Sequence, residues 1–116
     1  MFEYKVKEVV KIYDGDTITV ILDLGFDITK KEIIRLFGID TPEIRGEERP
    51  DGLKSRKRLV ELIEEHPDFY IKTYKDKTGK YGRMLGELMI PDNKTSINQI
   101  LINEGLAKPY FGGKKS

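Results

Sequence analysis

The residues best suited to chemistry lie in two short polar segments and at one arginine further along the chain. The first segment reads Asp14-Gly15-Asp16-Thr17, and the second runs from Arg35 to Asp40-Thr41-Pro42-Glu43; Arg83 ends a later Tyr-Gly-Arg stretch. Hard divalent cations prefer carboxylate and carbonyl oxygens, and arginine binds phosphoryl oxygens through a planar fork. These residue types therefore indicate metal-dependent hydrolysis of a phosphodiester.

Asp16 and Asp40 are the candidate ligands of a calcium ion. Asp16 follows a hairpin turn and Asp40 ends a predicted strand, so their carboxylates can meet if the two strands are neighbours. The Thr41 carbonyl is a candidate third ligand, because Pro42 restricts Thr41 to extended dihedral angles. Asp14 is expected to hold metal-bound water. Taken alone, however, Asp-Gly-Asp is also an ordinary turn sequence.

Glu43 is the candidate general base, since a carboxylate beside a cation can orient and deprotonate a water. Arg35 and Arg83 would stabilise the charge that develops on the phosphoryl group. The alternative is that Arg35 forms a structural ion pair with Asp40 or Glu43 and that Arg83 is merely solvated. The joint occurrence of these groups at strand ends and turns favours the functional interpretation.

Composition excludes several other kinds of site. The chain has 116 residues, no cysteine and one histidine, so disulfides, thiolate zinc sites and multi-histidine metal sites are ruled out. Its net charge of +1 is not that of a protein that coats nucleic acid through bulk charge. Signal-peptide and membrane-spanning patterns are both missing, so we expect a cytoplasmic protein that does not contact a membrane; secretion stays open if a signal peptide was removed.

Hydrophobic periodicity predicts a small α+β domain that is mainly β. Strands are expected at residues 2–13, 18–22, 32–39, 69–74 and 83–90. A polar loop at 44–52 precedes a helix from Leu53 to Pro67, and a capping box at 96–99 starts a short helix that Gly105 ends. This order predicts a five-stranded Greek-key OB-fold barrel over residues 1–111, followed by a frayed tail at 112–116.

The two polar segments, together with Lys80-Tyr81-Gly82-Arg83, resemble the motifs of the staphylococcal nuclease-like (thermonuclease) family. The similarity extends from about Val9 to Tyr110. It implies that calcium binds to Asp16, Asp40 and the Thr41 carbonyl, with Glu43 as base and with Arg35 and Arg83 as transition-state stabilisers. It also implies cleavage of DNA and RNA at the 5′ P–O bond, which leaves 3′-phosphate and 5′-hydroxyl ends.

The same resemblance implies a substrate of single-stranded or locally opened DNA or RNA. Lys80 and Tyr81 would contact a terminal phosphate, and Tyr110 would stack near a base. The chain departs from well-known members because it lacks their C-terminal third helix, carries Glu47 and Glu48 where they have a lysine-rich loop, and is nearly neutral. We expect a monomer and leave a weak dimer open.

Basic residues crowd the start of the helix predicted from Leu53, namely Lys54, Arg56, Lys57 and Arg58. They either form a basic patch at the mouth of the site or lie on a solvated face where Lys57 and Arg58 pair with Glu61. A non-catalytic OB-fold module that binds nucleic acid or a protein ligand is the main alternative to a nuclease. A barrel whose acidic cluster binds metal only for stability is a third, weaker alternative.

Overall fold

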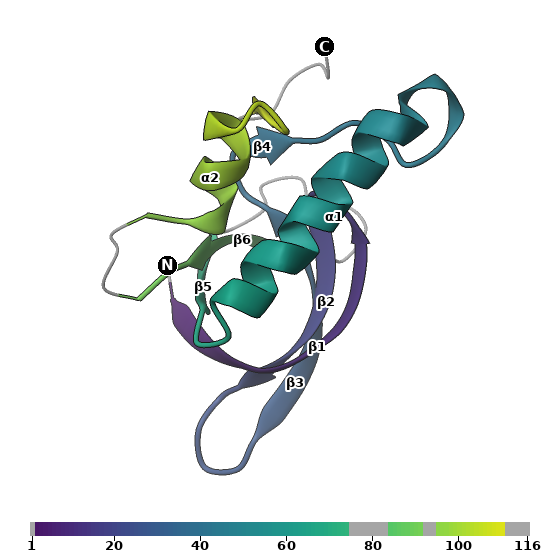
Figure 1. The fold of residues 1–116 in the computed structure, drawn as a ribbon. Helices are drawn as coiled ribbons and strands as arrows, with labels where there is room; N and C mark the ends of the chain where they lie inside the picture. The colour runs from purple at the N-terminus through teal and green to yellow at the C-terminus, as the bar shows by residue number, and fades with distance from the viewer. Residues whose placement is uncertain (1, 75–83, 92–94, 111–116) are drawn as a thin grey trace.

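Five strands form a closed barrel in the computed structural model, which describes residues 2–74, 84–91 and 95–110. The order around the barrel is β1-β2-β3-β6-β5, with β1 and β5 closing it (Figure 1). Only β3 and β6 pair in parallel among these neighbours. The strands are β1 (Glu3–Asp14), β2 (Thr17–Asp23), β3 (Thr29–Leu36), β5 (Tyr70–Tyr74) and β6 (Met84–Met89). This topology confirms the predicted five-stranded OB-fold barrel.

Two α-helices of the described chain cover the barrel. The remaining elements are β4 (Ile39–Asp40), the 3₁₀ turn η1 (Gly46–Glu48), α1 (Arg49–Glu65), α2 (Ile97–Asn103) and β7 (Lys108–Pro109). Strands β4 and β7 pair as a small second sheet next to α2 (Figure 1). None of the described helices combines the length and apolar character that crossing a bilayer requires.

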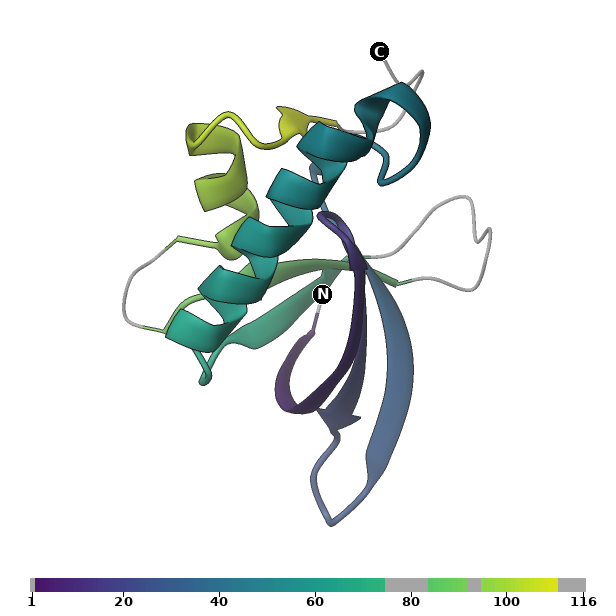
Figure 2. The same cartoon turned by 45° about the vertical axis from the view of Figure 1, so that its right-hand side comes forward.

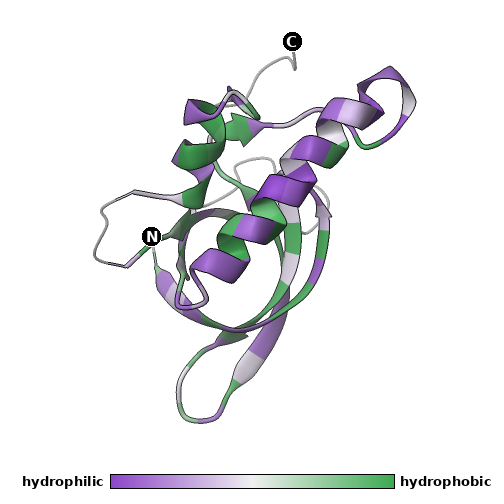
Figure 3. Cartoon of the chain, in the orientation of Figure 1, coloured by the Kyte–Doolittle hydropathy of each residue, from purple (hydrophilic) through white to green (hydrophobic). Residues whose placement is uncertain are grey.

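The core lies inside the barrel and beneath α1. Alternate residues of β2 and β3 point inward, and Ile18, Val20 and Ile34 are fully buried. The apolar side of α1, with Leu59 and Leu62, closes one end of the barrel, while its outer side is polar (Figures 1 and 3). Each large aliphatic side chain buried in this way contributes about 1.5–3 kcal/mol.

The boundary of α1 differs from the prediction. The helix begins at Arg49, four residues before Leu53, and η1 occupies most of the remaining segment that was predicted to be a polar loop. Pro50 stands in the first turn, where a missing N–H costs nothing. The four residues before Leu53 are Arg, Pro, Asp and Gly, so hydrophobic periodicity could not detect this first turn.

Strand β3 also begins earlier than predicted, at Thr29 and not at residue 32. The first residues of β3 pair with the end of β2, with Asp23 opposite Thr29. This hairpin projects away from the helices (Figure 2). The exposed side chains there show no apolar alternation, which explains why periodicity missed them. The predicted tail at 112–116 lies outside the described residues.

The predicted start and end of α2 are confirmed. The Ser96 hydroxyl accepts a hydrogen bond from the Gln99 N–H at 3.0 Å, and Gly105 follows the helix with φ of 76°. Asn98, on the buried side of α2, donates to the carbonyls of Phe37 at 2.9 Å and Gly86 at 3.2 Å. These bonds fix the turn between β3 and β4, and therefore the position of the residues that follow it.

Close packing of α1 against the segment after β4 yields a prediction about Gly52. A Cβ atom at this position would lie 2.1 Å from the Glu43 carbonyl oxygen and 2.8 Å from the Pro42 carbonyl oxygen. Alanine usually stabilises a helix relative to glycine. Here we expect Gly52→Ala to lower the free energy of unfolding by about 1–3 kcal/mol in urea titrations, because backbone must move.

The matched control is Lys57→Ala, at an exposed position on the same helix, which should change stability by at most about 0.5 kcal/mol. A Gly52→Ala variant as stable as the parent chain, or more stable, would contradict the close approach.

Candidate functional site

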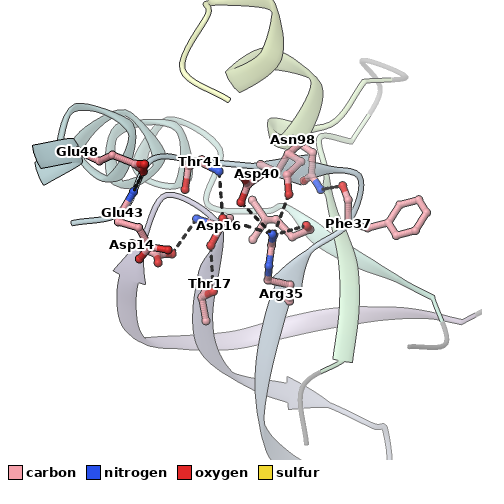
Figure 4. A network of polar contacts seen from close by, with 12 residues as sticks. Asp14, Asp16, Thr17, Arg35, Phe37, Asp40, Thr41, Glu43, Glu48 and Asn98 are labelled. Atoms are coloured by element: carbon pink, nitrogen blue, oxygen red, sulfur yellow. Dashed lines mark hydrogen bonds and ion pairs between the residues drawn. The ribbon is translucent and has the colours of Figure 1, made fainter. Parts of the chain in front are cut away.

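Asp16 is the buried centre of the candidate site. Its side chain lies in the turn between β1 and β2, and the residue is 6% exposed. One carboxylate oxygen, Oδ2, accepts a hydrogen bond from the Thr41 N–H at 3.1 Å, and Oδ1 accepts one from the Thr17 hydroxyl at 3.1 Å (Figure 4). Asp16 therefore connects the β1–β2 turn to the segment that follows β4.

Arg35 joins the two aspartates that the sequence singled out. Its Nη2 atom lies 3.5 Å from Asp16 Oδ2 and 3.5 Å from Asp40 Oδ1 (Figure 4). The pairing of Thr17 with Arg35 on adjacent strands brings these residues to the same end of the barrel. The ion pair between Arg35 and Asp40, left open by the sequence, is present and includes Asp16 as well.

The other terminal nitrogen of Arg35 is used by the backbone. Nη1 donates hydrogen bonds to the carbonyl of Leu36 at 3.0 Å and to that of Ile39 at 2.9 Å. These bonds hold the turn from β3 to β4 closed, and Gly38 in this turn has φ of 79°. Arg35 thus supports the local fold as well as the acidic cluster.

Asp14 and Asp16 have opposite electrostatic behaviour although they are two residues apart. Burial, a hydrogen bond with Asp16 and the negative charge of Asp16 raise the pKa of Asp14 to about 7. Burial acts against ionisation of Asp16 too, but hydrogen bonds from Asp14 and Thr41 and the Arg35 charge outweigh it and lower the pKa of Asp16. Asp14 therefore holds a proton more readily than its neighbour.

Glu43 lies next to this cluster but is exposed to solvent. Its N–H donates to Glu48 Oε1 at 2.8 Å, and Gly52 packs directly against its carbonyl (Figure 4). The backbone of Glu43 is therefore fixed while its side chain borders an open hollow, which is lined by Glu43, Arg45, Glu47 and Glu48. Water can reach the Glu43 carboxylate from this hollow.

Tyr110 is on the Arg35 side of the site. Its ring centroid lies 5.9 Å from the Arg35 guanidinium carbon, and its N–H donates to the Gly38 carbonyl at 2.8 Å. The structure thus brings together Asp14, Asp16, Arg35, Asp40, Thr41 and Tyr110, with Glu43 beside them. The other three site residues predicted from sequence, Lys80, Tyr81 and Arg83, lie outside the described residues.

The described carboxylates have the donor chemistry of an oxygen-ligated cation, but Arg35 Nη2 stands where they converge. Asp16 Oδ2 and Asp40 Oδ1 each lie 3.5 Å from that nitrogen. Within the described ranges no three acidic or histidine side chains gather closely enough to hold a metal on their own. Two carboxylates would therefore need a backbone carbonyl and waters to complete a shell, which calcium accepts.

The basic residues of α1, for which a basic patch and a solvated, paired face were both left open, differ in their contacts. Arg56 Nε donates to the Ile12 carbonyl at 2.9 Å, so it anchors β1. Arg58 forms an ion pair with Glu104 at 2.7 Å and a weaker one with Glu61 at 3.4 Å. The alternative pairing of Arg58 with Glu61 is thus present. Because α1 begins at Arg49, these residues lie beyond its first turn, contrary to the prediction.

Three supporting residues were missed by the sequence analysis. Thr17 orients Asp16, Glu48 holds the Glu43 backbone, and Asn98 fixes the β3–β4 turn. The position of Thr17 directly after Asp16 was a usable signal, because hydroxyl groups commonly bond to a neighbouring carboxylate. Glu48 and Asn98 act across segments whose proximity only the folded chain reveals.

The chain matches one family profile and several known proteins. Residues 33–116 match the sequence profile of the family described as staphylococcal nuclease homologue. Micrococcal nuclease of Shigella flexneri is 32% identical over 111 residues, covering 89% of this chain and 57% of that protein. Protein ParB of Escherichia coli is 30% identical over 116 residues, covering 92% and 59%.

A third relative is an uncharacterized protein of Methanocaldococcus jannaschii, which is 31% identical over 131 residues. The aligned region covers 94% of this chain and 61% of that protein. The chain thus spans between 57% and 61% of the length of these three relatives.

The raised pKa of Asp14 predicts how the metal-free protein responds to pH. Because the folded-state pKa of about 7 exceeds the ordinary aspartate value of 3.8, the bound proton stabilises the folded chain fully below about pH 4. This stabilisation is lost as pH rises through 7. In chelator, the free energy of unfolding should therefore fall between pH 4 and 7 more steeply for the parent chain than for Asp14→Asn.

Urea titrations at four or five pH values measure this difference. Asp27→Asn, in the exposed β2–β3 turn, serves as the matched control and should follow the parent chain. Parallel curves for the parent chain and Asp14→Asn would show that Asp14 does not retain its proton.

Proposed function

The chain belongs to the staphylococcal nuclease family, and on that basis we propose that it is a calcium-dependent nuclease that hydrolyses DNA, RNA or both at the 5′ P–O bond. The observation that carries the proposal is the convergence of Asp16 and Asp40 on Arg35 at the end of the barrel that also bears Glu43. The products would have 3′-phosphate and 5′-hydroxyl ends.

Asp16, Asp40 and the Thr41 carbonyl would hold the calcium ion, and Asp14 would bind one of its waters. Bound calcium supplies positive charge next to the phosphodiester. The buried position of Asp16 favours this role, because burial strengthens the attraction between a carboxylate and a cation. The hydrogen bond from the Thr41 N–H to Asp16 holds the backbone of Thr41, which carries the proposed carbonyl ligand, beside the Asp16 carboxylate.

Glu43 would remove a proton from the attacking water, whose oxygen forms a new bond to phosphorus. The bond from phosphorus to the 5′ oxygen breaks, and the leaving oxygen takes up a proton to become the 5′-hydroxyl. Arg35 and Arg83 would donate hydrogen bonds to phosphoryl oxygens as negative charge builds up. The open hollow beside Glu43 supports this assignment, since it gives water access to the carboxylate.

The substrate would be a single strand or a locally opened duplex. An enzyme can bind such a strand through its backbone and exposed bases, without recognising a base sequence. Tyr110, close to Arg35, would stack near a base, and Lys80 and Tyr81 would contact the terminal phosphate. The chain would act as a monomer.

A non-catalytic module that binds nucleic acid or a protein ligand is the second candidate. It is favoured by the engagement of both terminal nitrogens of Arg35, which pair with the aspartates and with backbone carbonyls. In that case the cluster would serve stability alone, and binding would occur without cleavage.

Cleavage of an end-labelled single strand separates the two candidates. The parent chain should cut in calcium and stop in excess chelator. Replacement of the proposed base in Glu43→Gln should slow cleavage by a factor of about 10²–10⁴. Glu64→Gln, the same change at an exposed position of α1, should leave the rate unaltered. Binding by the parent chain without any cleavage would instead support the non-catalytic module.

Arg35→Lys tests the proposed phosphate contact. A lysine ammonium cannot reproduce the planar fork, so we expect turnover to fall by a factor of about 10² or more. The free energy of unfolding must be measured in parallel, because Arg35 also holds the β3–β4 turn. Arg58→Lys, which alters a guanidinium that pairs with Glu104, should retain activity. Normal turnover in Arg35→Lys would remove Arg35 from the mechanism.

A further inference from the structure

A cationic and aromatic cluster beside the site has no role in the proposed chemistry. We name it the Tyr13 cluster, and it consists of Lys11, Tyr13 and Arg45. Arg45 Nη2 donates to the Tyr13 hydroxyl at 3.1 Å, and the Lys11 ammonium lies 5.4 Å from the centre of the Tyr13 ring. Tyr13 is 42% exposed, so its ring remains accessible to a ligand.

The cluster lies next to the proposed catalytic groups because of the chain connectivity. Tyr13 directly precedes Asp14 at the end of β1, and Arg45 lines the same open hollow as Glu43. Tyr110, in contrast, contacts Arg35. The site therefore has one aromatic side chain near Arg35 and another on the side of Glu43.

The chemistry of the cluster matches a nucleotide. An exposed aromatic ring provides a stacking surface for any base, and neighbouring cations attract the phosphates on either side of that base. Lys11 and Arg45 form no ion pair with a carboxylate anywhere in residues 2–74, 84–91 and 95–110, unlike Arg35 and Arg58. Neither cation is thus fixed on one carboxylate of the described chain, although Arg45 shares its hollow with Glu43, Glu47 and Glu48.

The end of β1 that carries this ring is also held firmly. Arg56 of α1 donates to the carbonyl of Ile12 at 2.9 Å, directly before Tyr13. A ring on an anchored strand loses little freedom when a base stacks on it, which favours binding.

We propose that the Tyr13 cluster is a binding subsite for a second nucleotide of a single-stranded nucleic acid, on the Glu43 side of the scissile phosphate. The base stacks on Tyr13, and Lys11 and Arg45 neutralise the adjoining phosphates. This inference rests on the proposed function, because it places the subsite relative to the phosphate that would be cut.

Fluorescence of an introduced tryptophan tests the stacking directly. The chain contains no tryptophan, so Tyr13→Trp in a Glu43→Gln background places the one indole of the molecule in the cluster. Addition of an oligothymidylate octamer should quench its emission saturably. Phe26→Trp in the same background is the matched control, since Phe26 is 99% exposed in the β2–β3 turn at the far end of the hairpin, and its emission should not change.

Affinity for the same octamer, measured by anisotropy, gives a second readout. Tyr13→Ala should weaken binding by about tenfold, and Tyr13→Phe, which retains the ring, should bind within about twofold of the parent chain. Lys11→Ala and Arg45→Ala should each reduce the slope of log affinity against log salt by about 0.7. Lys7→Ala, an exposed lysine on the same strand, should leave that slope unchanged.

The outcomes separate this inference from the proposed function. Quenching and a loss of affinity in Tyr13→Ala, in a chain that never cleaves, would support the subsite and contradict the nuclease. Normal cleavage with no quenching, and with unchanged octamer binding by Tyr13→Ala, would overturn the subsite and leave the nuclease intact. Failure of the octamer to bind any variant, including the parent chain, would also overturn the subsite.

Discussion

The buried carboxylate of Asp16 is the interaction on which the rest of this structure depends. A buried carboxylate without partners is strongly destabilising, so Asp16 requires the Thr41 N–H, the Thr17 hydroxyl and the Arg35 charge around it. Those three partners come from β2, β3 and the segment after β4. The contacts that stabilise this one charge therefore bring β2, β3 and the segment after β4 together.

Arg35 has two tasks at this position, which explains why the fold and the proposed chemistry are linked. Through Nη1 it closes the turn from β3 to β4, and through Nη2 it balances Asp16 and Asp40. Below about pH 7, Asp14 adds no full negative charge to the metal-free cluster, because its raised pKa lets it keep a proton there. Two carboxylates thus share one guanidinium in the metal-free cluster, which leaves a net negative charge, and a calcium ion would have to compete with that guanidinium.

The sequence was informative where local chemistry decides the structure. Alternation along β2 and the Ser96 cap of α2 gave correct elements, and the order of those elements predicted the barrel. The sequence was less informative where contacts between segments far apart in the chain decide the structure. In the first turns of α1, Gly52 packs against the backbone of Glu43, and Arg56 is anchored to β1 apart from the other basic residues of the helix. Neither contact produces a periodic pattern in the sequence.

Calorimetric titration of calcium into the metal-free chain decides whether Asp16 is the centre of a calcium site. We expect one ion per chain for the parent protein. We also expect no measurable binding to Asp16→Asn, whose retained fold would be verified by its far-ultraviolet circular dichroism. Undiminished calcium binding by a folded Asp16→Asn variant would contradict the claim that this buried carboxylate is the centre of the site.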